Sequence, residues 1–319
     1  MVSVELVLQD AGRFDWSPVD PELLALDTLV AGDYHVITLR LDGTQRTDLT
    51  PTFRPNRHKG QPAWHPSGTA LVMQVENDFG FHTIATSPGS GINNDLYLLP
   101  VNGTAPIPLR QMPVASLGVL HPHFSHDGQT LFWAELVTPR SGATFGGDWR
   151  LFLADYVATP TPHLENVRSH EPNGVGWYES HGFDAVDGRV FFTHVPDGSE
   201  QLDVYSMAVD GTGVVRHTND AHWDEHAWPS PGGTRMAWMS SRFLTGWNGS
   251  YLSLRTEVYM QDLAGGNVEQ LTAFNEGSFT RFVAADLMWN STGDAIMVYV
   301  HSGNGSSEEL HLIRLNAAY

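Results

Sequence analysis

The sequence predicts an all-β fold, a six-bladed β-propeller with four antiparallel strands in each blade. Two observations lead to this prediction. A pattern of aromatic anchor, polar turn and β-type run recurs six times, with anchors about 45 to 60 residues apart, a period typical of propeller blades. No window of 12 or more residues keeps a 3.6-residue apolar period, so we expect little helix.

The six repeats share an aromatic residue that is followed by a turn, usually one that contains glycine. Their anchors are Trp16, Trp64, Phe124, Phe183, Trp228 and Trp289. A second strand follows each anchor, at Leu23–Leu29, Ala70–Val75, Thr130–Leu136, Val190–His194, Met236–Met239 and Ala295–Val300. A third strand and an Asn-Gly or Asp-Gly hairpin signal, as at Asn102-Gly103, then lead into a fourth strand.

The two ends of the chain complement each other. The last repeat supplies three strands, and Val4-Glu-Leu-Val-Leu ahead of the first anchor is suited to be its fourth, which removes an exposed sheet edge. We therefore predict one propeller domain over residues 1–319. The expected blades are 11–51, 60–110, 120–164, 180–218, 225–272 and 285–315, with 3–9 as the closing strand. A two-sheet sandwich or two smaller β domains is the alternative architecture.

Composition excludes several functional classes. The 36 Asp and Glu residues against 17 Lys and Arg give a net charge of −19, which repels phosphate backbones, so we expect no nucleic-acid partner. No apolar run approaches the ~20 residues of a membrane helix, so we expect no membrane partner. The absence of cysteine excludes disulfides, thiolate nucleophiles and Cys-ligated metals.

The start of the chain bears on the compartment. Met1-Val-Ser-Val-Glu has no basic, apolar and small-residue signal pattern, so the sequence as given predicts a cytoplasmic protein. A periplasmic or secreted protein whose leader had been removed would have the same sequence. An acidic surface and a closed ring of sheets favour a monomer.

Two repeats resemble a known family. Ala63-Trp-His-Pro-Ser-Gly-Thr-Ala-Leu and His123-Phe-Ser-His-Asp-Gly-Gln-Thr-Leu-Phe-Trp are similar to the Pro-x-Trp-Ser-Pro-Asp-Gly repeat of TolB-like (WD40-like) six-bladed propellers. The resemblance covers nearly the whole chain and implies the fold, but propellers perform unrelated tasks. No Gly-x-Ser-x-Gly nucleophile elbow of a propeller-bearing serine peptidase occurs.

Polar residues recur at one position near the start of the innermost strands. Counting back six residues from the motif's turn Asp gives Arg13 or Phe14, then Gln61, His121, His181, His226 and Asp286. The innermost strands of a propeller start around one mouth of its channel, so we expect these side chains to converge. Long connections at 76–94, 137–148, 168–180 and 241–256 lie on the same face, which favours a functional face.

Imidazole and carboxylate together suit zinc or manganese better than calcium, so we predict a divalent metal site built from His121, His181, His226, Gln61 and Asp286. The acids Glu179, Asp224 and Glu225 are candidates to orient the imidazoles or to act as general base, and we assign the catalytic roles to Glu225 and Asp224. Arg13 is the third residue to which we assign a catalytic role, as the candidate to hold an anionic group.

The register leaves an alternative open. Blades four and five have one extra residue between anchor and turn, so His181 and His226 align either with His121 or with Pro122. A one-residue slip reverses a strand side chain, although a bulge near the strand start can restore it. A water-filled polar channel without metal is the other interpretation of the same residues.

The set of three histidines and a glutamine is similar to that of oligogalacturonate lyases, propellers that bind manganese at the channel mouth. The resemblance implies that Gln61, His121, His181 and His226 are ligands; the net charge argues against their polyanionic substrate. We therefore predict a metal-dependent hydrolase or lyase that acts on a small or oligomeric substrate. The alternatives are a non-catalytic propeller that binds a protein or peptide partner, as TolB-type domains do, and a structural ring within a larger assembly.

Overall fold

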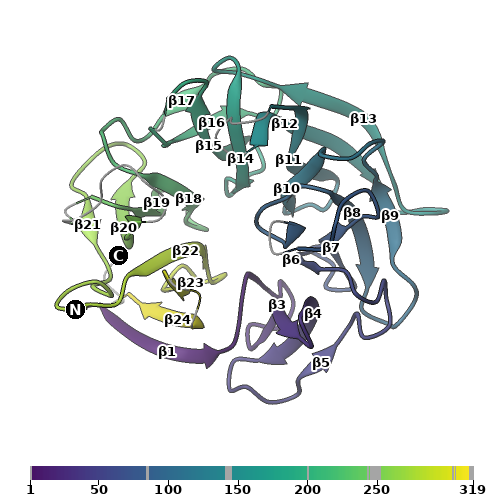
Figure 1. Ribbon diagram of the computed structural model, residues 1–319. Helices are drawn as coiled ribbons and strands as arrows, with labels where there is room; N and C mark the ends of the chain where they lie inside the picture. The colour runs from purple at the N-terminus through teal and green to yellow at the C-terminus, as the bar shows by residue number, and fades with distance from the viewer. Residues whose placement is uncertain are drawn as a thin grey trace. The chain divides into compact units, whose positions relative to one another are not determined.

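Six four-stranded sheets account for all named strands in the computed structural model, which describes residues 2–83, 86–140, 146–199, 201–242, 244, 253–303, 305 and 307–315 (Figure 1). Within each sheet, strands that follow one another in the chain are neighbours, and the pairs run antiparallel; β1, which pairs with β24, is the exception in order. No α-helix occurs in these ranges, and none of their segments is a helix that could span a membrane. The predicted class, six blades of four strands, is confirmed.

The chain forms two compact units, Arg13–Phe183 and a second unit of Met1–Gly12 with Asp184–Tyr319. The first unit contains β2 (Phe14–Trp16), β3 (Leu23–Val30), β4 (Asp33–Arg40), β5 (Thr47–Asp48), β6 (Lys59–Trp64), β7 (Ala70–Glu76), β8 (Asn94–Pro100), β9 (Ile107–Arg110), β10 (Gly118–Phe124), β11 (Thr130–Pro139), β12 (Gly147–Val157), β13 (His163–His170) and β14 (Gly176–Phe183). Its complete sheets are β2–β5, β6–β9 and β10–β13.

The second unit contains β1 (Ser3–Gln9), β15 (Arg189–Pro196), β16 (Asp203–Ala208), β17 (Val215–Arg216), β18 (Asp224–Pro229), β19 (Arg235–Ser240), β20 (Glu257–Asp262), β21 (Glu269–Gln270), β22 (Phe282–Trp289), β23 (Ala295–Ser302) and β24 (Glu308–Arg314). Here the N-terminal strand β1 pairs antiparallel with the C-terminal strand β24, from Ser3↔Arg314 to Gln9↔Glu309 (Figure 1). The prediction that the N-terminal strand completes the last blade is confirmed.

The repeated turn explains the repeated glycine. In four blades this turn is closed by a backbone hydrogen bond from a glycine amide to the carbonyl three residues earlier, such as Gly68 N to His65 O and Gly128 N to Ser125 O, both 2.9 Å. The glycine φ values are 70° at Gly68, 72° at Gly128, 64° at Gly233 and 73° at Gly293. Glycine adopts these left-handed values without the steric cost that a Cβ imposes.

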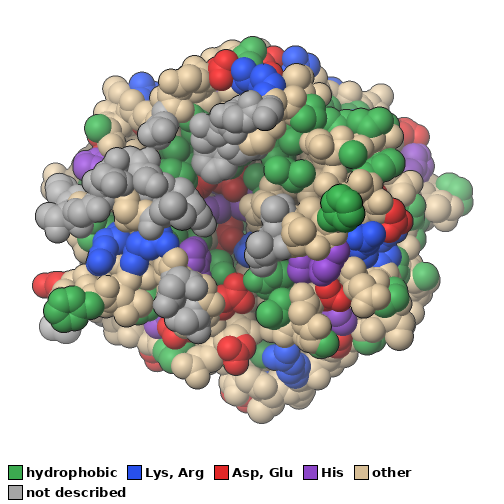
Figure 2. Space-filling model, in the orientation of Figure 1, with side chains coloured by type: hydrophobic (Ala, Val, Ile, Leu, Met, Phe, Trp, Pro, Cys, Tyr) green, Lys and Arg blue, Asp and Glu red, His purple; other side chains and the backbone are tan. Residues whose placement is uncertain are grey.

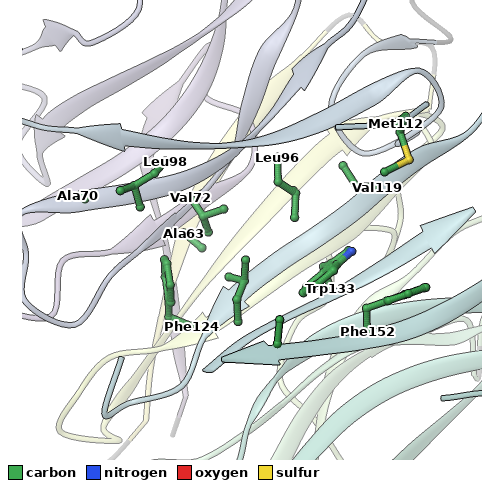
Figure 3. Close-up of a cluster of buried hydrophobic side chains, with 12 residues drawn as sticks. Ala63, Ala70, Val72, Leu96, Leu98, Met112, Val119, Phe124, Trp133 and Phe152 are labelled. Atoms are coloured by element: carbon green, nitrogen blue, oxygen red, sulfur yellow. The ribbon is translucent and has the colours of Figure 1, made fainter. Parts of the chain in front are cut away.

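The anchors and second strands pack between neighbouring sheets. In the first unit, one buried cluster joins Ala63 and Val72 of the β6–β9 sheet to Phe124 and Trp133 of the β10–β13 sheet (Figure 3). Trp133 is fully buried and stacks on Phe152 at 5.5 Å between ring centroids. Burial of apolar surface of this kind is the main favourable term in folding.

A buried carboxyl joins the first two blades of the first unit. Asp15 on β2 accepts a hydrogen bond from the backbone amide of Trp64 on β6. The side chain is buried, and burial raises the pKa of Asp15 to about 7, against the opposing effect of that hydrogen bond. The neutral acid is therefore the form that the fold prefers.

We expect Asp15→Asn to be more stable relative to wild type at pH 8 than at pH 4. Because the folded-state pKa lies above the unfolded value, the wild-type protein takes up a proton on folding and loses stability as pH rises from about 4 to about 7. Between pH 4 and pH 8, the free energy of unfolding of Asp15→Asn is expected to rise relative to that of the wild type by about 4 kcal/mol, measured by urea denaturation at both pH values. Asp42→Asn is the matched control, because the pKa of the exposed Asp42 is lowered and its effect has the opposite sign. A pH-independent difference between Asp15→Asn and wild type contradicts the prediction.

Candidate functional site

Three innermost strands carry the same irregularity at the predicted position. Register shifts fall between Gly60 and Ala63 in β6, between Leu120 and His123 in β10, and between Glu225 and Trp228 in β18. Each shift is a β-bulge, which re-aims a side chain at the edge of a sheet.

The first bulged residue has a left-handed backbone in all three strands: φ is 50° at Gln61, 47° at His121 and 51° at His226. His226 therefore takes the conformation of His121, not that of Pro122, which answers the register question for this blade. Non-glycine residues with positive φ cost roughly 1–3 kcal/mol each and tend to occur at functional sites. A fourth bulge lies between Ala284 and Leu287 in β22. There Asp286 is the second of the two bulged residues, whereas Gln61, His121 and His226 are the first.

Buried polar side chains fasten the bulges of the first unit. Asp27 on β3, which has no exposed surface, accepts hydrogen bonds from the backbone amide of Gln61 at 2.9 Å and from Nε of Arg13 at 3.0 Å. The Oε1 of Gln74 on β7 accepts a hydrogen bond from the backbone amide of His121 at 3.1 Å. The backbone that carries each site residue is thus held by the neighbouring sheet or strand.

In the first unit, His121, Glu179 and His181 form a cluster. One ligand atom from each lies within 4.8 Å of the others, and all three side chains are buried. The Glu179 Oε1 is 3.1 Å from the His121 Nδ1. A carboxylate on Nδ1 fixes the ring and selects Nε2 as the nitrogen that binds a metal.

Gln61 contributes a different donor in the same unit. Its side chain is 6% exposed, and its Oε1 has no hydrogen-bond partner among the described residues. Leaving a buried amide oxygen without a partner is costly, so a cation or a water molecule is its natural complement.

In the second unit, His226 has the same arrangement as His121. Its Nδ1 lies 3.0 Å from the Asp286 Oδ1, and its Nε2 lies 3.8 Å from the Glu225 Oε2. Glu225 is itself held by a 2.7 Å hydrogen bond from the Trp223 indole. Asp286 is placed to orient His226, and Glu225 lies on the Nε2 side of the ring.

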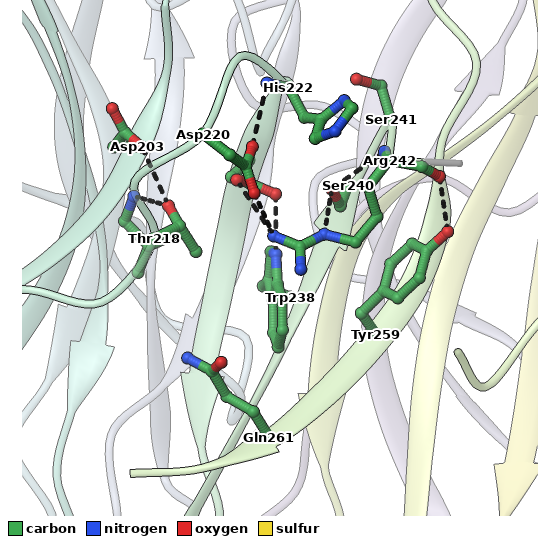
Figure 4. A network of polar contacts seen from close by, with 12 residues as sticks. Asp203, Thr218, Asp220, His222, Trp238, Ser240, Ser241, Arg242, Tyr259 and Gln261 are labelled. Atoms are coloured by element: carbon green, nitrogen blue, oxygen red, sulfur yellow. Dashed lines mark hydrogen bonds and ion pairs between the residues drawn. The ribbon is translucent and has the colours of Figure 1, made fainter. Parts of the chain in front are cut away.

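Asp224 and Arg13 are engaged in structural contacts. Asp224 has no exposed surface, accepts a hydrogen bond from the Trp238 indole at 2.8 Å, and lies 3.5 Å from the Arg242 Nη2. Burial raises its pKa to about 6. Figure 4 shows Arg242 between Asp220 and the Trp238 ring. Arg13 is 8% exposed, paired with Asp27, and lies over the Tyr34 ring.

Asp27 and Gln74 were not singled out by the sequence analysis. Their signal is a single polar residue inside an apolar strand, Leu24-Ala-Leu-Asp27 and Leu71-Val-Met-Gln74. A buried polar residue of this kind is hydrogen-bonded, and here its partner is a bulge. Of the long connections, residues 84–85, 141–145, 243 and 245–252 lie outside the described residues.

Known structures share the fold of this chain. No protein-family model and no curated protein matches it. A putative TolB from Agrobacterium tumefaciens is similar at a TM-score of 0.62 and 18% identity, over 94% of this chain and 97% of that one. TolB from Acinetobacter baumannii follows at 0.59 and 16%, over 97% of this chain and 63% of that one, so the chain spans less than two thirds of its length.

An oligogalacturonate lyase in complex with manganese is also similar, at a TM-score of 0.55 and 15% identity, over 99% of this chain and 91% of that one. The fold is a six-bladed β-propeller. At these identities the likeness establishes the architecture alone, and the resemblance to TolB-like propellers is confirmed at that level. The chemistry has to be argued from the side chains.

We expect Asp27→Asn to destabilise the protein by about 3–5 kcal/mol, because the change leaves Arg13 buried beside an amide that cannot accept all of its hydrogen bonds. Urea denaturation at pH 7 measures the change in the free energy of unfolding. Glu5→Gln is the control: Glu5 pairs with Arg314 at 2.9 Å, but both side chains are more than half exposed, and such pairs contribute about 0–1 kcal/mol. Equal losses in the two variants contradict the role given to Asp27.

Proposed function

We propose that this protein is a metal-dependent hydrolase or lyase. A divalent ion is held by His121, His181 and His226, with Gln61 as a further donor, at the start of the innermost strands. One observation supports this most strongly: His121 and His226 occupy equivalent left-handed bulge positions, and each has a carboxylate on Nδ1, at 3.1 and 3.0 Å. Because equivalent positions of propeller blades face one axis, the same local geometry repeated favours a shared ligand.

Zinc and manganese suit this donor set, since imidazole nitrogens predominate. The likeness to a manganese-bound oligogalacturonate lyase supports the same choice. A bound divalent ion would polarise a carbonyl or phosphoryl oxygen, or lower the pKa of a water molecule.

The protein's own residues would supply orientation and proton transfer. Glu179 and Asp286 orient His121 and His226 through Nδ1. Glu225 would take a proton, from water in a hydrolase or from substrate carbon in a lyase, because its Oε2 lies on the Nε2 side of His226 and the Trp223 indole keeps it in place.

The substrate is a small or oligomeric molecule rather than a polyanion. The net charge of −19 opposes a polyanionic ligand. On the face shown in Figure 2, the basic side chains that are drawn form separate small groups, not a continuous surface. Esters and phosphoesters remain compatible with the site.

A second candidate function is non-catalytic binding of a protein or peptide. The likeness to two TolB structures, at TM-scores of 0.62 and 0.59, supports it. The two candidates differ in the metal, so metal content separates them.

We expect a triple variant, with His121, His181 and His226 replaced by alanine, to contain one equivalent of metal per chain less than the wild type when both are purified without chelator. Elemental analysis measures the metal content of the wild type and of the triple variant. Added zinc or manganese is expected to raise the melting temperature of the wild type, because a ligand selective for the folded state stabilises it. His163→Ala is the control, because this exposed histidine lies outside the proposed ligand set and pairs with the Glu165 carboxylate at 2.9 Å. Unchanged metal content in the triple variant contradicts the enzyme proposal and leaves the binding propeller.

A milder variant isolates the orienting carboxylate. Glu179→Gln is expected to weaken metal affinity about 10–100-fold without removing a nitrogen ligand. Competition with a fluorescent chelator gives the dissociation constant. Glu165→Gln, which alters the exposed His163–Glu165 pair, is expected to leave the affinity at the wild-type value. An unaltered dissociation constant for Glu179→Gln would show that Glu179 does not position His121.

A further inference from the structure

A second group of metal-ligand side chains lies in the first unit and uses none of the residues above. Asp33 begins β4, His58 directly precedes β6, and His82 lies in the connection between β7 and β8. One ligand atom from each lies within 4.8 Å of the others. Three segments far apart in sequence therefore bring two imidazoles and a carboxylate together.

His82 is oriented as a metal-binding histidine is. Its Nδ1 lies 2.7 Å from the Glu76 Oε2, and its Nε2 lies 2.9 Å from the Asp33 Oδ1. Glu76 has no exposed side-chain surface and is fixed by hydrogen bonds from the His58 amide at 3.0 Å and the Thr86 hydroxyl at 2.6 Å. A rigid carboxylate on Nδ1 again selects Nε2 as the ligand nitrogen.

His58 supplies the second imidazole. Its ring centroid is 4.3 Å from that of His82, and the residue is 2% exposed. Its Nδ1 accepts the Tyr34 amide at 3.2 Å, so its buried Nε2 carries the ring proton and faces the backbone of Thr83. An ion at Nε2 would take the place of that proton.

Binding through Nε2 moves the ring proton of His58 to Nδ1 and so gives up the hydrogen bond from Tyr34. That change leaves two donors, the Nδ1 proton and the Tyr34 amide, facing each other, so the bound ion has to offset the loss of this hydrogen bond and of the acceptor of a buried amide. The ion also replaces the proton between the exposed His82 and the partly buried Asp33, so neither group loses its counterpart there.

Carboxylates and basic side chains both surround the group. Asp33 and Glu76 contribute two carboxylates. Arg57 lies 3.5 Å from Glu76 and 3.4 Å from Asp78. Lys59 directly follows His58, is buried, and interacts electrostatically with Asp33 and Glu76, so a bound cation competes with two basic side chains for these carboxylates.

We propose that Asp33, His58 and His82 form a second divalent metal site of zinc type, with Glu76 orienting His82. Two imidazoles and one carboxylate are a common set of zinc ligands, and water completes the coordination. Through His82, the ion would bind the connection between β7 and β8 to Asp33 of the β2–β5 sheet and to His58 beside the β6–β9 sheet.

Zinc titration of the full chain tests the proposal. Equilibrium dialysis against Zn²⁺ followed by elemental analysis is expected to give one zinc less per chain for His82→Ala than for wild type. His82→Gln, which keeps a polar side chain, is expected to show the same loss and guards against a folding defect. His35→Ala is the matched control, because His35 also pairs with an aspartate, Asp48 at 2.8 Å, and is outside the cluster. It should bind as much zinc as wild type.

The location is read separately from the stoichiometry. Zinc is expected to slow hydrogen exchange of residues 77–83 in wild type and in His121→Ala, but not in His82→Gln. Wild-type zinc content in both His82 variants, with unchanged melting temperatures in the absence of metal, overturns the proposal. If His121→Ala retains all its zinc while His82→Gln loses one, the second site stands and the proposed catalytic site fails.

Discussion

The β-bulge at the start of the innermost strands is the constraint on which the candidate site depends. Each bulge places one extra residue in a left-handed conformation, at Gln61, His121 and His226. In a regular strand the side chain at this point would be directed by the pleat alone. Because of the bulge, that side chain no longer follows the in-and-out alternation of the strand. A polar residue can therefore point out of the sheet while the next residues of the strand pack in the core.

This arrangement has a cost that the neighbouring strands offset. A left-handed non-glycine residue is strained, and its amide leaves the regular ladder. Asp27 and Gln74 restore the missing hydrogen bonds from within otherwise apolar strands. Burying them is tolerable only because their partners are in place, which ties position and stability together. The residues that hold the site are therefore as buried as the hydrophobic core around them.

The blades could be predicted from the sequence because each depends on local signals: the aromatic anchors, the turn glycines such as Gly68 and Gly128, and the N-terminal strand that pairs with β24. The recurrence of Gln61, His121 and His226 was likewise visible as a pattern. Two things were not visible. The bulge that sets the register depends on a hydrogen bond from another strand, and the group of Asp33, His58 and His82 joins a hairpin, a strand start and a connection that share no repeat.

The same scaffold accounts for likeness to both TolB and a manganese-bound lyase at 15–18% identity. Anchors, turns and second strands determine the blade and are needed in any protein of this shape, so they carry no information on chemistry. The bulge, present in four of the innermost strands, adds a side chain that the packing of the blade does not require, such as Gln61, His121 or His226. Imidazoles held through Nδ1 by Glu179 and Asp286 have the arrangement of a metal ligand or of a general base, which the blade itself does not require. For this fold, the residue at the first bulged position is therefore a better guide to activity than overall similarity.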